Sequence, residues 1–221
     1  MALNINGTTG ISGVDGSVSA PAVTGTDSNT GITFPSADTI KFSTGGVERI
    51  SITNSGISGT GISSGGLTEA DSWRVSTTFQ GDANPITNNW ERFDASGEGK
   101  KGTGMTQSNG YFTFPSTGYW YLHFSATFYR GGNSTVYNQF AHIRTTTNDS
   151  SYSERARGAS SMYSSSGNSG AGASAETIFQ CDDTSTHKVI FGVEVGNQYV
   201  YTYGSTANNQ TNVVFIKLAD L

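Results

Sequence analysis

The chain has 221 residues, of which 29 are glycine and only 13% are charged, and its formal net charge is -5. This acidity excludes a surface built to neutralise phosphates, and no basic cluster exceeds the pair Lys100 and Lys101, so we expect no nucleic-acid partner. No apolar run approaches the roughly 18 residues that span a bilayer, and the start of the chain lacks a signal-peptide pattern, so we expect no membrane insertion.

Aromatic residues divide the chain into two parts. Of the 3 Trp, 10 Tyr and 12 Phe, only Phe34 and Phe42 precede residue 67. Apolar and polar residues alternate with a period of two throughout, and no convincing helical stripe interrupts them, so the sequence predicts an all-β protein. We expect an N-terminal arm (residues 1–24), a short shaft with a linker (residues 25–66) and a C-terminal domain (residues 67–221).

Residues 1–24 are small and polar and offer almost nothing to bury. Alone, such a segment is expected to be extended or disordered, so any order in it must come from another surface. We expect a few apolar side chains to anchor the segment by packing against that surface: Ile5, Ile11 and Val14.

Residues 31–52 predict three short strands joined by two turns, because bulky apolar residues alternate with polar ones in three runs. A sheet this narrow cannot offset its ordering entropy as a monomer. Several copies wrapped about a common axis could do so, because the apolar stripe of each chain would then meet its equivalents. The stripe residues expected at this interface are Ile32, Phe34, Ile40 and Phe42.

Two further features surround these strands. Glu48 and Arg49, beside the second turn, either mark a solvated face or form an ion pair between chains. Residues 53–66 repeat the triplet Gly-Ile-Ser at 56–58 and 61–63, which is typical of a flexible linker with an occasional apolar peg.

The C-terminal domain predicts about nine short strands separated by glycine-rich turns, a pattern typical of a β-sandwich or jelly roll. These strands are expected at 73–79, 90–93, 111–114, 119–129, 137–144, 175–181, 187–195, 199–203 and 212–218. In the strand at 119–129, one face carries Trp120, Leu122, Phe124, Ala126 and Phe128, which we assign to the core. The other face is too aromatic for plain exposure to solvent, so we expect it to be an interface between identical subunits.

Candidate chemical motifs favour structural interpretations. "GEGKKG" (residues 97–102) has the letters of a dinucleotide fingerprint, but no helix is predicted after it, so we expect a turn and no cofactor. Asp182 and Asp183 predict a capped turn rather than a calcium site. The lone Cys181 is expected to be buried and inert. Carboxylate pairs such as Glu69 with Asp71, or Glu91 with Asp94, could serve a glycosidase, but solvated edge charges are the stronger interpretation.

The three histidines, His123, His142 and His187, fall on separate predicted strands without companion ligands, so we expect no metal site. With no catalytic motif in the sequence, we expect no enzyme activity. Residues 148–176 are rich in Ser and Gly with a few Tyr and Arg, which indicates either a long solvated connection or an adaptable binding loop.

A resemblance covers much of the domain. "FTFPSTGYWYLHFSA" (residues 112–126) resembles the central signature of C1q/TNF-like jelly rolls, with Phe112, Gly118 and then large side chains at alternate positions. "GASAETIFQCDDTSTHKVIFGVEV" (residues 172–195) and "NVVFIKLADL" (residues 212–221) resemble the closing strands of that family. The family forms tight trimers. The resemblance therefore implies a three-fold contact that involves Tyr119, Tyr121, Tyr199, Tyr201 and Tyr203.

The arm and shaft resemble a second group. Residues 11–52, and "FSTGGVERI" within them, are similar to N-terminal segments of virion structural and tail-fibre proteins of tailed phages, especially those that infect marine cyanobacteria. This resemblance implies a homotrimeric fibre: an arm bound to another virion protein of the capsid, tail or baseplate, a thin β shaft, and a jelly-roll head. Such a protein is made in the host cytoplasm and exposed on the extracellular particle.

On this basis we expect a fibre that attaches the particle to a host-surface glycan or protein. The side chains expected to bind that receptor lie in two loop regions: Tyr137, Tyr152, Arg155, Arg157 and Tyr163. One alternative is a purely architectural decoration or connector protein that binds no receptor. Another is a tailspike that degrades polysaccharide, which the absence of a long β-helical repeat disfavours.

Overall fold

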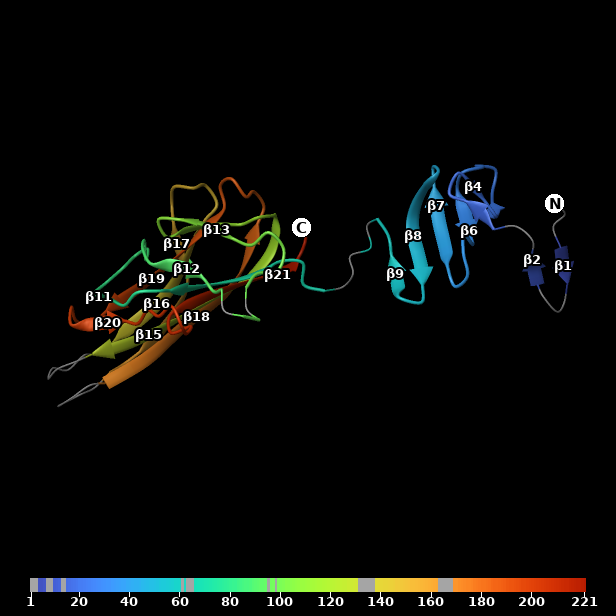
Figure 1. Ribbon diagram of the computed structural model, residues 1–221. Helices are drawn as coiled ribbons and strands as arrows, with labels where there is room; N and C mark the ends of the chain where they lie inside the picture. The colour runs from blue at the N-terminus through green and yellow to red at the C-terminus, as the bar shows by residue number, and fades with distance from the viewer. Residues whose placement is uncertain are drawn as a thin grey trace. The chain divides into compact units, whose positions relative to one another are not determined.

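The computed structural model describes residues 4–6, 10–12, 15–60, 62, 66–94, 96–97, 99–130, 138–162 and 169–221. The chain divides into two compact units, Met1–Gly66 and Leu67–Leu221, called here the N-terminal unit and the head. All the regular structure of the described residues is β-strand, which confirms the all-β class (Figure 1). Among the same residues, no helix is long and apolar enough to cross a membrane.

The N-terminal unit consists of two hairpins and one larger sheet. The hairpins pair β1 (Asn4–Asn6) with β2 (Gly10–Ser12), and β3 (Gly16–Ser17) with β4 (Ala20–Pro21). The larger sheet, called the small sheet, is antiparallel, with the order β5 (Val23–Thr24), β6 (Gly31–Thr33), β7 (Ile40–Thr44), β8 (Val47–Thr53) and β9 (Gly56–Ser58). The three strands expected between residues 31 and 52 are therefore present as β6, β7 and β8.

Residues 15–24 are held in place by strand β6 of the same chain. The amide of Phe34 donates to the carbonyl of Asp15 at 2.8 Å, and the amide of Ala22 donates to the carbonyl of Ile32 at 2.9 Å. Short extended strands, β3 to β5, make up much of this segment, and the surface that orders it belongs to the same chain. Backbone pairing to a neighbouring strand orders them although they bury little apolar surface.

The head is a sandwich of two antiparallel sheets (Figure 1). The large sheet has the order β11 (Phe79–Gln80), β20 (Val200–Thr202), β15 (Gly118–Arg130), β21 (Asn212–Ala219), β10 (Ala70–Val75) and β12 (Trp90–Arg92), and β18 (Ser169–Cys181) pairs with β15. The second sheet has the order β13 (Thr106–Ser108), β14 (Tyr111–Thr113), β19 (Lys188–Val195), β16 (Gln139–Thr146) and β17 (Ser153–Ser160).

Each of the nine strands expected in the head is present, with shifted ends. The strands that the sequence did not reveal are β11 and β13, which are short, and β17, which carries no bulky apolar residue. The expectation that residues 148–176 form a loop is wrong, because they contain β17 and the first part of β18. Small residues are required there: a Cβ added to Gly158 would lie 1.8 Å from the carbonyl oxygen of Ser174, where the edges of the two sheets meet.

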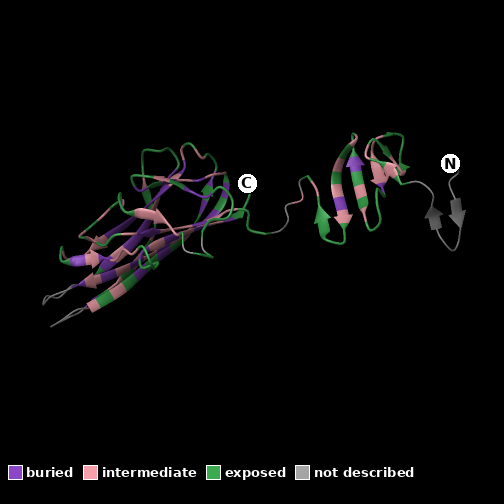
Figure 2. Cartoon of the chain, in the orientation of Figure 1, coloured by how far each residue is buried: buried purple, intermediate pink, exposed green. Residues whose placement is uncertain are grey.

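The core lies between the two sheets of the head (Figure 2). The face of β15 assigned to the core is confirmed, because its five apolar side chains are at most 1% exposed. Phe112 of β14 joins the sheets, with its ring centroid 5.4 Å from that of Phe191 on β19 and 5.3 Å from that of Phe215 on β21. This rigid sandwich fixes the outward-facing side chains of β15 at defined positions on the opposite face of the large sheet.

Candidate functional site

The outward face of the large sheet gathers aromatic side chains from β15 and β20. On β15, Tyr119, Tyr121, His123 and Tyr129 alternate with the buried core residues. Tyr201 is the register partner of Tyr129, so the two side chains share this face, and their ring centroids are 6.3 Å apart. We call this surface the tyrosine face.

The other tyrosines expected at a three-fold contact lie close to this face or beside it. The ring of Tyr203 packs at 5.5 Å from that of Tyr129. Tyr199, just before β20, is 53% exposed. The structure thus brings the aromatic residues selected from the sequence onto one side of the large sheet, although they come from separate segments of the chain.

Aliphatic residues of the neighbouring strands complete the tyrosine face. Tyr121 of β15 lies between Ile178 of β18 and Ile216 of β21 in register, and Ile178 is 63% exposed. The sequence alone did not reveal these two residues, because their place on this face depends on strand register. Period-two alternation along 175–181 and 212–218 is the signal that could have placed them opposite the core.

Polar side chains also lie on the tyrosine face, and two of them form a close pair. The hydroxyl of Tyr121 donates to the Glu176 carboxylate at 2.5 Å, and this hydrogen bond raises the pKa of Tyr121. His123 stacks beside Tyr121 with a ring centroid distance of 6.5 Å and is the register partner of Glu176. The same face also carries Ser125 and its register partners Ser174 and Asn212. A surface that combines aromatic and aliphatic side chains with polar ones is typical of a protein–protein interface.

The small sheet of the N-terminal unit carries a second apolar surface. Directly paired residues share a face, and the register aligns Val23, Ile32, Phe42 and Ile50 in one row. The next row along the strands contains Ile40, Ile52 and Ile57. Phe34, two residues after Ile32, lies on the same side. We call this surface the apolar face of the small sheet.

A β-bulge adds one more member to this surface. Pairing between β7 and β8 shifts after Phe42, so that Ser43 faces Glu48 and Thr44 faces Val47. Arg49 is the extra residue, and if residues 47–50 alternated regularly without this bulge, Val47 would point to the opposite side. Val47 is 50% exposed on the apolar face.

The opposite side of the small sheet carries the buried side chains of this unit, and these side chains are polar, whereas the core of a protein is ordinarily apolar. Thr33, Ser43 and Ser51 are buried there, whereas none of the apolar side chains on the other side is buried (Figure 2). Glu48 pairs with Lys41 at 2.6 Å, and Arg49 donates to the hydroxyl of Thr44 at 2.7 Å, so both residues have partners within their own chain. The described part of this unit therefore has no apolar core of its own.

An open hollow of about 370 Å³ lies on the apolar face. Phe34, Ile40 and Ile52 supply its apolar lining, and Asp38 and Asn54 stand among its polar residues, joined by a 3.2 Å hydrogen bond. Such a hollow suits an apolar side chain of a partner better than a polar small molecule, because its walls offer few free hydrogen-bonding groups.

The expected receptor-binding side chains are engaged within the head where the structure describes them. The guanidinium of Arg157 lies 4.5 Å from the ring centroid of Phe140 and donates to Glu194 at 2.6 Å. Arg155 donates to the hydroxyl of Thr145 at 3.0 Å. Both arginines belong to β17 and not to a loop.

Two further receptor candidates, Tyr137 and Tyr163, lie outside the described residues. Tyr152 is half-buried, and its ring packs edge-on against Tyr111 with a centroid distance of 5.5 Å. Burial raises the pKa of Tyr152 to about 12. Its ring is therefore partly committed to packing within the head.

The expected anchoring residues lie at the start of the chain. Ile5 of β1 and Ile11 of β2 are register partners in a hairpin, and Val14 lies outside the described residues. The two isoleucines thus occur side by side in the chain's first hairpin.

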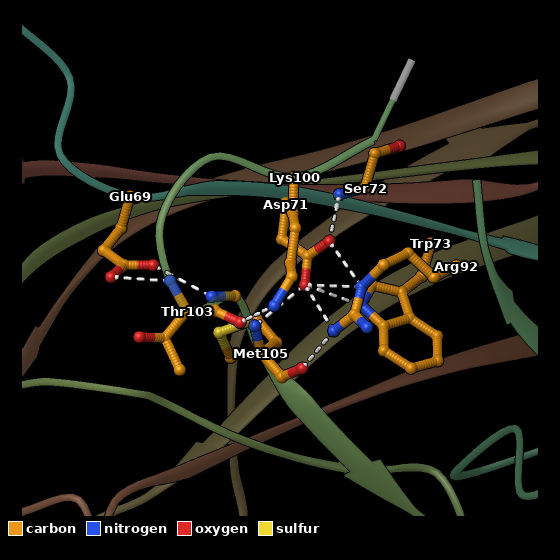
Figure 3. A network of polar contacts seen from close by, with 9 residues as sticks. Glu69, Asp71, Ser72, Trp73, Arg92, Lys100, Thr103 and Met105 are labelled. Atoms are coloured by element: carbon orange, nitrogen blue, oxygen red, sulfur yellow. Dashed lines mark hydrogen bonds and ion pairs between the residues drawn. The ribbon is translucent and has the colours of Figure 1, made fainter. Parts of the chain in front are cut away.

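A polar network holds residues 99–105 against β10 and β12 (Figure 3). Asp71 is 2% exposed and accepts hydrogen bonds from Arg92, from the indole of Trp73 and from the amide of Met105 at 2.8 Å. The interpretation of Asp71 as a solvated edge charge is therefore wrong. Glu69 accepts from the amides of Thr103 and Gly104. These two carboxylates therefore position a loop.

The same network explains Gly102, the last glycine of the motif at 97–102, and Gly104 just after it. Gly102 has a φ of +74°, and an added Cβ would lie 2.5 Å from the carboxylate of Glu69. Gly104 has the same φ, and its added Cβ would meet a carboxylate oxygen of Asp71 at 2.8 Å. These glycines let the backbone approach two carboxylates, which is a structural role.

The remaining motifs are structural as well. The amide and hydroxyl of Ser185 donate to Asp183, which confirms the capped turn and lowers the pKa of that carboxyl. Burial raises the pKa of the Cys181 thiol to about 11, in agreement with a buried and inert residue. No cluster of three potential metal ligands occurs among the described residues. The tyrosine face and the apolar face of the small sheet are therefore the best candidates for function.

Comparison with known proteins supports the fold of the head. No family model and no curated protein matches the sequence. Among solved structures, Eiger TNF from S. frugiperda is similar with a TM-score of 0.50 and 12% identity over 69% of this chain and 93% of that chain. Murine APRIL at pH 5.0 gives 0.49 and 11% over 68% and 98%. The match to Eiger TNF shows the fold: this all-β chain contains a TNF-like jelly roll.

Proposed function

We propose that this chain forms a homotrimer that serves as a fibre or appendage of a phage particle. One observation carries the proposal: the N-terminal unit and the head each present an apolar sheet face that no described residue of the same unit covers. A soluble protein rarely exposes contiguous apolar patches above a few hundred Å² unless they meet a partner. The number three is supported by the jelly-roll resemblance, and the role on a particle by the resemblance of residues 11–52.

In this proposal the N-terminus binds another virion protein, and the head points to the host. Ile5 and Ile11 stand in the first hairpin of the chain, where an edge is available for pairing with a partner strand. Three equivalent weak sites on each trimer, repeated over many trimers, would bind a host-surface glycan or protein by avidity. In this proposal the function of the chain is assembly on the particle and multivalent attachment to the host, and it involves no catalysis.

A purely architectural role is the second candidate. The contacts that the expected receptor-binding residues make within the head favour it. Arg155, Arg157 and Tyr152 are all engaged by neighbours within the head, so they are less available to a receptor than residues in an open loop. Binding of labelled protein to cells of candidate cyanobacterial hosts separates the two roles. Saturable binding supports attachment, and a trimer that binds no such cell supports an architectural decoration or connector.

The oligomer itself is tested by light scattering of the full chain after size exclusion. We expect a mass three times the 23.2 kDa of one chain. Ile178→Glu places a charge on the tyrosine face and should lower that mass, whereas Thr147→Glu, at an exposed position outside the strands, should leave it unchanged. A monomeric wild-type chain would contradict the trimer, and an unaffected Ile178→Glu trimer would remove the tyrosine face from the interface.

A further inference from the structure

The apolar face of the small sheet extends to both edges of the sheet. Val23 on the edge strand β5 is 50% exposed, and Ile57 on the opposite edge strand β9 is 59% exposed. No described residue of either edge strand is buried. A patch meant for a small ligand would be confined to the middle of the sheet, whereas this one continues to the two edges where another sheet could join.

Charge distribution restricts what can cover this surface. The ion pair of Lys41 with Glu48 lies on the polar side, because each residue shares that side with Ser43 or Ser51 in the pairing register. The rows of the apolar face consist of Val, Ile and Phe, and the charged residues beside them, Asp38 and Arg49, are hydrogen-bonded to Asn54 and Thr44 of the same chain. A charged glycan or an acidic or basic peptide would find little counter-charge over these rows, whereas the equivalent apolar rows of another copy are complementary to them.

Strand direction determines how identical copies can meet. All neighbouring strands of the small sheet are antiparallel, so β5 and β9 run in the same direction. Rotation about an axis parallel to the strands therefore brings β9 of one copy beside β5 of the next, with the free backbone groups of both edges facing each other. A two-fold arrangement would instead bring β9 against β9 or β5 against β5.

We propose that three small sheets close into a three-sided β prism, with β9 of each copy against β5 of the next and the apolar faces turned to the axis. This inference rests on the proposed trimer and adds to it which edges meet. Closure would cover Val23 and Ile57, fill the hollow lined by Phe34 and Ile40 with side chains of a neighbouring copy, and protect both edges from unwanted pairing.

The proposal is tested with the full chain carrying Val23→Cys and Ile57→Cys together, treated with a short bifunctional maleimide. A flexible crosslinker is needed because the two residues lie in adjacent rows of the register. We expect covalent trimers from the double variant on a denaturing gel, and no covalent product from either single variant. The buried Cys181 is present in every variant, so the wild-type chain measures its contribution. Ser28→Cys with Ser55→Cys, both in exposed turns, is the matched control.

Each other outcome has a definite meaning. Covalent dimers from Ile57→Cys alone would show that like edges meet and would overturn the cyclic arrangement. A trimer by light scattering that gives no covalent trimer in the double variant would overturn the prism and leave the proposed function intact. A monomer by light scattering would contradict both the prism and the proposed trimer. The mass in solution therefore separates failure of the prism alone from failure of the proposed function.

Discussion

At the residue scale, His142 couples the stability of the head to pH. Its side chain is fully buried on β16, and no hydrogen bond reaches its Nδ1. Burial lowers the pKa of His142 from its ordinary value, and the nearby Arg144 lowers it further, while Glu194 at 4.0 Å and Glu154 partly oppose this shift. The folded head therefore binds this proton less readily than the unfolded chain does.

The sign of the pH dependence follows from this difference. Above the unfolded pKa of about 6.5 both states are neutral at this position, and as pH falls below it the unfolded state gains the proton first. We expect the urea midpoint of unfolding to fall between pH 7.5 and pH 5.5, and we expect His142→Gln to reduce that fall. Asp27 and Asp183, whose pKa values are lowered below 3.8, titrate too low to contribute in this range. An equal fall in the variant would assign the effect to other groups.

At the scale of strands, the contact between β17 and β18 explains a segment that looked like a loop. The two strands belong to different sheets and close one side of the sandwich, and their Ser, Gly and Ala residues allow the backbones to approach. Gly158 faces the carbonyl of Ser174, whereas an added Cβ at Gly172 would have nothing nearer than the carbonyl oxygen of Ala126 at 3.8 Å.

These two glycines form a matched pair for mutation. Gly158→Ala should destabilise the head by about 1–3 kcal/mol or more, because the new methyl group can be accommodated only by moving a strand. Gly172→Ala should be neutral or stabilising by up to about 1 kcal/mol, because alanine restricts the unfolded chain. Urea unfolding of both variants measures the difference. Equal stabilities would show that β17 can move away from β18 at little cost.

The same comparison shows what sequence patterns could predict. Strands with large side chains, such as β15 and β21, were recognisable because core and solvent faces alternate along them. β17 was not, because its residue types were selected by a close backbone contact and not by burial of apolar area. Likewise the tyrosine face could be predicted in part from β15 alone, but Ile178 required knowledge of register. Val47 required a bulge that no local pattern indicates.

For the whole molecule, the two units differ in how a single chain can stabilise them. The head buries a continuous aromatic and aliphatic core, but in the described part of the N-terminal unit the buried side chains are Thr33, Ser43 and Ser51. Hydrophobic burial is the main favourable term in folding, so a sheet that leaves its apolar rows exposed gains little of it as a monomer. Its stability should then depend on assembly.

This dependence predicts that thermal unfolding varies with protein concentration. Partner chains that bind only the folded state stabilise it by mass action, so the Tm of the first transition should fall as the full chain is diluted. Phe42→Asp, in the centre of the apolar face, should lower that Tm and weaken its dependence on concentration. Ser55→Asp, in the exposed turn between β8 and β9, is the control that introduces the same side chain off this face. Differential scanning calorimetry provides the measurement, and a Tm that stays constant on dilution would show that the N-terminal unit is stable without a partner.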